Sequence, residues 1–379
     1  MGVPAAPAGG GDASQGRIVI KGRGANSNRA SRYLPTHSEA ESDGWETAEA
    51  PGGPAAGVDS GVEVATELYP DATRRLITRN QSPDIPFDRS INPYKGCEHG
   101  CIYCFARPTH AYLDLSPGID FETRIFYKTG VRETLIAELG KPGYRCRPIA
   151  MGTNTDPYQP AEKTQRVTRT VLEVLLEHNH PVTIVTKGQL ILRDLDLLSE
   201  LARRGLASVA VSLTTLDNEL KTRLEPRAAG PAARLRMIRE LSDAGVPTGV
   251  MVAPVIPFLN DHEIEAMVQA AAEAGASRAN YILLRLPLEV APLFEDWLAV
   301  HYPMRAERVM SAIRASRGGK AYDSTWGRRM RGEGVFADLI GRRFAAAVKR
   351  FGLEQEGRGQ EELRTDLFRP PGHRQMDLF

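Results

Sequence analysis

The chain has 379 residues, of which 42% are hydrophobic and 25% are charged, and its formal net charge is +1. This composition is typical of a globular protein with one large domain or two small ones, and the near-zero charge favours no class of partner. No apolar run is long enough to cross a bilayer, and the first residues lack the basic start and apolar stretch of a secretory signal, so we expect a cytoplasmic protein with no membrane partner.

Residues 1–60 are rich in Gly, Ala, Pro and Ser and show little apolar periodicity. Such a segment buries too little apolar surface to fold, which predicts a disordered N-terminal region. The basic element KGRGANSNRASRY within it is set apart, and whether it is ordered stays open at this point.

Residues 61–300 alternate short β-branched runs with helical patterns. We predict strands at 89–94, 148–153, 182–187, 208–213, 248–256 and 279–286. Helices are predicted near 161–179, 194–204, 230–244 and 261–274, and several end at a glycine: Gly205, Gly245, Gly275. Strands that are apolar on both faces and separated by helices are typical of a parallel sheet inside a helical layer. The predicted fold class is therefore α/β, a partial (β/α)6 TIM-like barrel with a helical C-terminal extension and its chemistry at the carboxyl ends of the strands.

Residues 301–354 are predicted to form a basic helical extension, and 355–379 an extended tail. Between 310 and 351, ten Lys and Arg stand against three acidic residues, a net charge of +7. Two interpretations stay open: a solvated helix face with a basic loop, or a surface that binds an anion or nucleic acid.

Three of the four cysteines, Cys97, Cys101 and Cys104, lie within eight positions of the segment NPYKGCEHGCIYCFARP. They are too few and too close for a disulfide framework, and they fit a reducing compartment. Three small core residues are one interpretation, although the loop is polar. A zinc ion with His99 or His110 as the fourth ligand is another, although zinc sites usually combine two short ligand-bearing segments and only one is present. An iron–sulfur cluster is the third: three thiolates leave one iron of a [4Fe–4S] cluster open for chemistry.

The fourth cysteine, Cys146, precedes the second predicted strand and therefore lies away from the carboxyl ends. We interpret it as structural.

The Cys-x3-Cys-x2-Cys spacing in the loop after the first strand resembles the radical S-adenosylmethionine superfamily. The resemblance implies a [4Fe–4S] cluster on the three cysteines, S-adenosylmethionine on the open iron, and reductive cleavage to a 5′-deoxyadenosyl radical. It also implies an external electron donor of the flavodoxin or ferredoxin type. Tyr103, directly before the third cysteine, matches an aromatic that packs near the adenine in that superfamily.

Further cofactor-binding residues follow by position. Gly152, Thr153 and Asn154 stand after strand two, where the superfamily binds the amino group of S-adenosylmethionine; a helix N-cap is the alternative. At the ends of strands three and four, Lys187 and Ser212 are candidates for the cofactor's carboxylate and its surroundings. Arg227, in EPR, is a candidate unless it is a solvated loop residue.

The order CxxxCxYC, TDP, VTK, SLTT, EPR and PVIPFLND, over about residues 85 to 290, resembles the spore-photoproduct-lyase-like group of DNA repair photolyases. That lyase uses a cysteine after strand two as hydrogen donor, where this chain has Met151 and Gly152. The resemblance therefore implies a radical enzyme acting on nucleic acid, with a substrate other than the lyase's.

The last residues, QMDLF, resemble the pentapeptide that binds bacterial sliding clamps. Met376, Leu378 and Phe379 would fill an apolar groove and Gln375 would fix the register; a terminus packed on the protein's own surface is the alternative. From a different functional class, we also consider a non-catalytic protein that binds a metal or cluster and is recruited to DNA through this tail.

Overall fold

The computed structural model describes residues 20–29, 31–33, 64–355 and 363–372. Its largest sheet has eight strands in the order β11-β10-β9-β8-β7-β6-β3-β2, and the central strands are parallel to one another from β3 to β10. The strands are β2 (Ile77–Arg79), β3 (Arg89–Ile91), β6 (Ile149–Met151), β7 (Val182–Thr186), β8 (Ala207–Ser212), β9 (Thr248–Val255), β10 (Arg278–Leu283) and β11 (Glu354–Gln355). The end strands β2 and β11 do not pair with each other, so the barrel is partial, as predicted.

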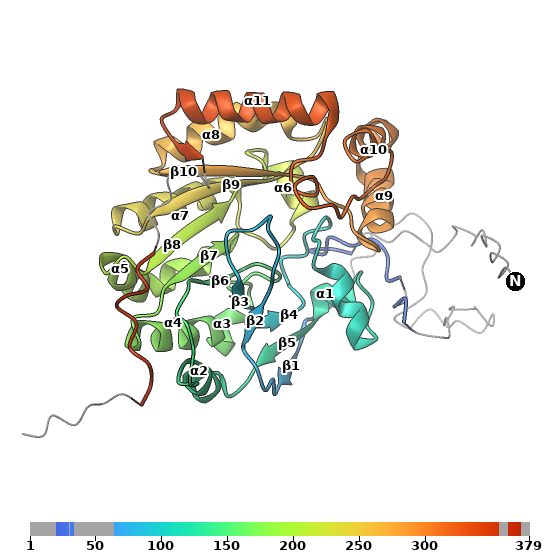
Figure 1. The fold of residues 1–379 in the computed structure, drawn as a ribbon. Coiled ribbons are helices and arrows are strands. Elements are labelled where there is room, and N and C mark those ends of the chain that lie inside the picture. The colour runs from blue at the N-terminus through green and yellow to red at the C-terminus, as the bar shows by residue number, and fades with distance from the viewer. Residues whose placement is uncertain (1–19, 30, 34–63, 356–362, 373–379) are drawn as a thin grey trace, which may run out of the picture.

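Helices connect the parallel strands and cover the outer face of the sheet (Figure 1). They are α2 (Val131–Leu139), α3 (Glu162–Gln165), α4 (Val167–Glu177), α5 (Leu195–Arg203), α6 (Asn218–Leu224), α7 (Pro231–Asp243) and α8 (Ile264–Glu273), with short 3-10 turns η2 (Gln189–Asp194) and η3 (Asp261–Glu263). Alternate strand residues such as Val209 and Val211 are buried in one apolar core with the inward stripes of these helices, for example Val171 and Leu175 of α4. This packing carries the carboxyl ends of all six parallel strands to one edge, called here the carboxyl edge.

A second sheet of three strands, β1-β5-β4, was not predicted. It contains β1 (Glu67–Asp71), β4 (Tyr94–Lys95) and β5 (Arg124–Lys128), and α1 (Asp120–Thr123) and the 3-10 helix η1 (Arg107–Leu113) precede β5. The predicted strand 89–94 is divided between the two sheets, because Pro93 has no N–H to continue the ladder. β1 is mostly exposed and reads ELYPD, so its sequence gave no apolar signal.

The predicted helix 161–179 is likewise two helices, α3 and α4, because Arg166 between them adopts a left-handed conformation with φ of 53°. Gly205, Gly245 and Gly275 all have positive φ at the ends of helices, which confirms that part of the prediction.

The C-terminal part contains α9 (Val290–His301), α10 (Ala306–Ala315) and α11 (Gly334–Arg350). In Figure 1, α11 lies along α8 above the β10 end of the sheet, and residues 363–372, which form neither helix nor strand, run beside the α4 and α5 side. The proposed clamp-binding residues 375–379 lie outside the described residues. No helix in the described ranges is long and apolar enough to span a bilayer.

Candidate functional site

The cysteine loop, residues 96–105, leaves β4 at the carboxyl edge. Two glycines shape it: Gly96 and Gly100 have φ of 79° and 67°, and a Cβ on Gly96 would lie 2.9 Å from the His110 and Ile125 side chains. The N–H of Cys97 donates to the carbonyl of Phe121 at 2.9 Å, which fixes the start of the loop. The loop is therefore held tightly in place by its neighbours.

All three thiols are free; Cys97 and Cys101 are buried and Cys104 is half-buried. Burial raises the pKa of each thiol, that of Cys101 to about 12, while the positive charge of Lys187 lowers the pKa of Cys101 and Cys104. The pKa of Cys97 is also raised by the charges of the other two, so the three groups lie close enough to interact. Within the part of the chain that the structure describes, no three His, Cys, Asp or Glu side chains are placed closely enough to hold a metal ion.

The chemistry of this donor set nevertheless fits an iron–sulfur cluster. Three free thiols from a single loop are donors of the kind that iron–sulfur clusters bind. Of the histidines in the zinc interpretation, His99 has Nδ1 3.4 Å from the Asp156 carboxylate, and His110 has Nε2 3.0 Å from the carbonyl of Arg124, while its buried Nδ1 makes no hydrogen bond within the described residues. Because zinc sites usually combine two short ligand pairs, three thiols from one loop fit a cluster better than a zinc ion.

A buried ion pair braces the loop from behind. Arg107 and Glu122 are both fully buried and lie 2.5 Å apart. The Arg107 guanidinium also donates to the carbonyls of Cys101 at 2.9 Å and Gly100 at 3.2 Å, and to two carbonyls of the 117–118 turn. One side chain thus ties the loop to the segment before β5.

The N-terminal segment, defined as residues 20–29 and 31–33, packs on this brace. The N–H groups of Gly24 and Ala25 donate to the Glu122 carboxylate, each at 2.9 Å, and Arg23 donates to the Glu122 carbonyl. A Cβ on Gly24 would lie only 1.8 Å from the carbonyl oxygen of Gly100, so the segment touches the cysteine loop directly. This is the basic element that the sequence set apart, and it is ordered here within the region predicted to be disordered.

The predicted residues after β6 lie next to the end of β3. Thr153 Oγ1 and the N–H of Asn154 both contact Oδ1 of Asn92, at 3.3 and 3.2 Å. Gly152 has φ of 80°, and a Cβ there would lie 1.8 Å from the carbonyl oxygen of Val185. Glycine is therefore required at position 152 by the close approach of β7.

Asp156, two residues further on, connects three strand ends. Its carboxylate accepts hydrogen bonds from Oγ1 of Thr186 at 2.6 Å and from the N–H of Lys187 at 2.7 Å, and it lies beside His99 of the cysteine loop. Burial would raise its pKa, but the His99 charge and these hydrogen bonds together lower the pKa to about 2. The TDP motif contains this aspartate, but the sequence pattern did not indicate its role.

Tyr103 belongs to a buried network on the far side of the loop. Its hydroxyl donates to the Glu225 carboxylate, which also accepts from Oγ1 of Thr214 at 2.6 Å and pairs with the buried Arg234. Burial would raise the pKa of Glu225, but Arg234 and then Lys187 outweigh it and bring the pKa to about 2. Glu225 therefore stays ionised and holds Tyr103 in place.

The remaining predicted residues divide into two groups. Lys187 lies at the site, with Nζ 5.9 Å from the centre of the Tyr103 ring. The Ser212 hydroxyl donates to the carbonyl of Ala253 at 3.2 Å, and the N–H of Arg227 donates to the carbonyl of His99 in the cysteine loop at 3.3 Å. Cys146 precedes β6 and lies at the opposite end of that strand from the cysteine loop.

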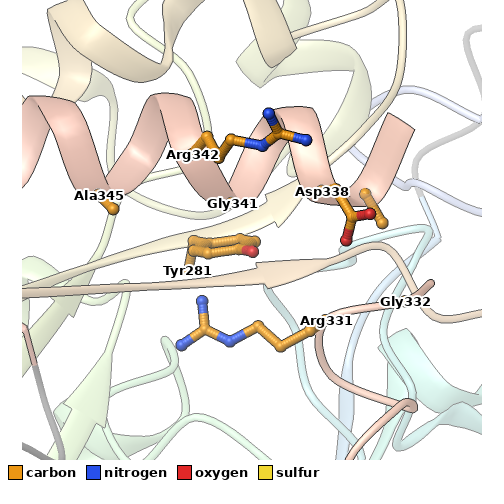
Figure 2. A pocket seen from close by; sticks show the side chains of 8 residues that line it. Tyr281, Arg331, Gly332, Asp338, Gly341, Arg342 and Ala345 are labelled. Carbon is orange, nitrogen blue, oxygen red and sulfur yellow. The ribbon is translucent and has the colours of Figure 1, made fainter. Parts of the chain in front are cut away.

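A cavity of about 340 Å³ lies elsewhere, between β10 and α11 (Figure 2). Figure 2 shows Arg331 and Arg342 on opposite sides of the Tyr281 ring. None of the predicted site residues lines this cavity, so we place the functional site at the carboxyl edge, where the cysteines are.

This fold and the cysteine loop at its carboxyl edge are those expected of a radical enzyme that depends on S-adenosylmethionine. The family model described as "Radical SAM superfamily" matches residues 91–271, and the chain belongs to this superfamily.

Its relatives include the uncharacterized protein Rv2578c of Mycobacterium tuberculosis, which is 41% identical over 232 residues, covering 61% of this chain and 68% of the relative. The uncharacterized protein MJ0683 of Methanocaldococcus jannaschii is 26% identical over 213 residues, covering 56% of this chain and 76% of the relative.

Among solved structures, spore photoproduct lyase is similar in fold. One variant matches with a TM-score of 0.54 and 17% identity over 76% of this chain and 81% of the other. Another, with bound AdoMet and dinucleoside spore photoproduct, matches with a TM-score of 0.55 and 15% identity over the same shares.

Proposed function

We propose that this protein is a radical S-adenosylmethionine enzyme that holds a [4Fe–4S] cluster on Cys97, Cys101 and Cys104 and acts on nucleic acid. The observation that carries the proposal is the set of three free thiols in one braced loop at the carboxyl edge of six parallel strands. Together, the bound cluster and S-adenosylmethionine would supply a 5′-deoxyadenosyl radical by reductive cleavage of the sulfonium.

The residues around the loop would bind and orient the cofactor. Lys187 presents a cation for the methionine carboxylate, and the Tyr103 ring, held by Glu225, presents an apolar surface for the adenine. Gly152, Thr153 and Asn154 would bind the amino group at the end of β6. Ser212 and Arg227 are weaker candidates, because the Ser212 hydroxyl already has a partner and the hydrogen bond from Arg227 to the loop comes from its backbone.

A nucleic-acid substrate is supported by the fold of spore photoproduct lyase, one structure of which is complexed with dinucleoside spore photoproduct. The chain lacks that enzyme's hydrogen-donating cysteine after strand two, and Gly152 has no room for any side chain. We therefore propose a different radical reaction on nucleic acid. An external flavodoxin- or ferredoxin-like protein would supply the electron.

The test is anaerobic reconstitution of the wild-type chain and two matched variants, Cys101→Ala and Cys146→Ala. We expect roughly four irons per chain, visible absorbance, and 5′-deoxyadenosine on reduction with dithionite, for the wild type and for Cys146→Ala. Cys101→Ala should lose all three. Stoichiometric zinc with no visible absorbance, or loss of iron from Cys146→Ala, would contradict the proposal.

A further inference from the structure

Arg285 lies beside the cysteine loop, although 181 positions separate it from Cys104 in the sequence. It stands two residues after the end of β10, at the carboxyl edge. Its guanidinium carbon lies 4.3 Å from the centre of the Phe105 ring, and Phe105 directly follows Cys104. Phe105 is 43% exposed and Arg285 is half-buried, next to the proposed cluster.

Two further arginines come to the same place from the basic stretch 310–351. Arg317 is buried and donates to the carbonyls of Leu283 and Leu284, at the end of β10, and to two carbonyls of the 328–329 turn. Arg329 pairs with the Asp84 carboxylate at 2.6 Å. The basic stretch therefore folds back onto the carboxyl edge instead of forming only a solvated helix face.

Of these three arginines, Arg285 is the one without a direct polar contact. Among residues 20–29, 31–33, 64–355 and 363–372, no hydrogen bond or ion pair engages its guanidinium, which lies over the ring of Phe105. Burial is the main cause that lowers the pKa of Arg285, and Arg329 lowers it further, while Tyr322, Cys104 and Asp84 offset part of this effect. A half-buried cation without a direct carboxylate contact is stabilised by a ligand that supplies a negative charge.

The surroundings favour a phosphate that belongs to a nucleic acid. A guanidinium binds two phosphate oxygens at once in its planar fork. Nucleic-acid-binding sites place such arginines beside exposed aromatic rings, on which bases stack. Phe105 provides such a ring beside Arg285, at the end of the cysteine loop.

We propose that Arg285 binds a backbone phosphodiester of the substrate and that Phe105 packs against an adjacent base. This inference rests on the proposed function and deepens it, because it names the part of the substrate that the protein holds. Arg317, anchored to the strand end, keeps the surroundings positive without contacting the phosphate.

The experiment measures fluorescence anisotropy of labelled single-stranded tetranucleotides on the anaerobically reconstituted protein with S-adenosylmethionine. One DNA and one RNA oligonucleotide have phosphodiester linkages, and a third has uncharged methylphosphonate linkages. The variants are Arg285→Gln, Arg285→Lys and the matched control Arg350→Gln. Arg350 also covers a phenylalanine ring, that of Phe351, at 5.3 Å, but it ends α11 near the start of β10.

We expect Arg285→Gln to weaken phosphodiester binding about tenfold to a hundredfold, because a charge-assisted contact is lost. The affinity of Arg285→Lys should lie between those of Arg285→Gln and the wild type, and Arg350→Gln should bind like the wild type. Replacing the phosphodiester by methylphosphonate linkages should weaken binding to the wild type by a similar factor and should change binding to Arg285→Gln little. The slope of log affinity against log salt should decrease by about one in Arg285→Gln.

The inference is overturned if Arg285→Gln and Arg350→Gln bind the phosphodiester oligonucleotide equally well. It is also overturned if Arg285→Gln loses the same factor of affinity for the phosphodiester and the methylphosphonate oligonucleotides, or if the wild type binds no oligonucleotide. Iron content and thermal midpoint show whether Arg285→Gln is folded, and Arg285→Lys decides the question if it is not. Formation of 5′-deoxyadenosine by the wild type is measured in parallel. If it occurs without oligonucleotide binding, only the phosphate site is wrong; if no cluster or 5′-deoxyadenosine forms, the proposed function itself is wrong.

Discussion

Replacing Glu122 with Gln tests how the cysteine loop is held in place. The Glu122 carboxylate is fully buried and accepts hydrogen bonds from Gly24 and Ala25, each at 2.9 Å, and from Arg107 at 2.5 Å. Glutamine keeps the volume, but it removes the charge and turns an NH2 group toward N–H donors. The buried Arg107 guanidinium then has no anion beside it.

Removing one partner of a buried ion pair typically costs about 3–5 kcal/mol of unfolding free energy. Arg107 keeps its four carbonyl partners, so we expect the lower end, about 3 kcal/mol. The matched control is Glu177→Gln, which breaks the pair with Arg132. Both of those side chains are more than 40% exposed, and such pairs contribute about 0–1 kcal/mol.

The assay is anaerobic urea unfolding of the wild type and both variants, monitored by circular dichroism. In cluster-free protein, Glu122→Gln should also speed the reaction of Cys97 and Cys101 with a thiol reagent, because the loop loses its brace. A loss of less than about 1 kcal/mol, within the range of the exposed pair, would refute the reasoning, as would equal losses in Glu122→Gln and Glu177→Gln.

Three further predictions concern other parts of the chain. Gly152→Ala should destabilise more than Gly245→Ala: both glycines have positive φ, which costs an L-residue about 1–2 kcal/mol, but only Gly152 has a carbonyl of β7 within 1.8 Å of the added Cβ; equal thermal midpoints would contradict this. The pKa of Glu225 is lowered from 4.5 to about 2, so its contribution to stability is present above its unfolded pKa and is lost as the pH falls toward 2. The wild type should therefore have a higher thermal midpoint than Glu225→Gln at pH 6, and a difference that does not shrink by pH 3 would count against it. A peptide of the last dozen residues should bind a bacterial sliding clamp, and replacing Leu378 and Phe379 with Ala should remove most of that binding, since each buried side chain contributes about 1.5–3 kcal/mol; equal binding by both peptides, or by neither, would leave the tail without this role.

The sequence by itself determined the fold class and the place of the cysteines. Six apolar runs alternating with helical patterns are local signals, and parallel strands must bring their carboxyl ends to one edge. The spacing of Cys97, Cys101 and Cys104 is also local, because a single loop contains all three. The second sheet was missed because β1 is polar and β4 has only two residues.

Only the tertiary structure decided what surrounds that loop. The contact of Gly24 with Glu122 joins residues 98 positions apart, the hydroxyl of Tyr103 meets Glu225 across 122 positions, and neither pair leaves a periodic or spaced pattern in the sequence. Net charge showed that the stretch 310–351 is basic, but the backbone carbonyls at the end of β10 decide where its arginines lie. The spacing of residues within one loop can be read from neighbouring positions, whereas contacts between distant segments depend on how the whole core packs. The partners of the cysteine loop come from distant segments, so only the tertiary structure shows them.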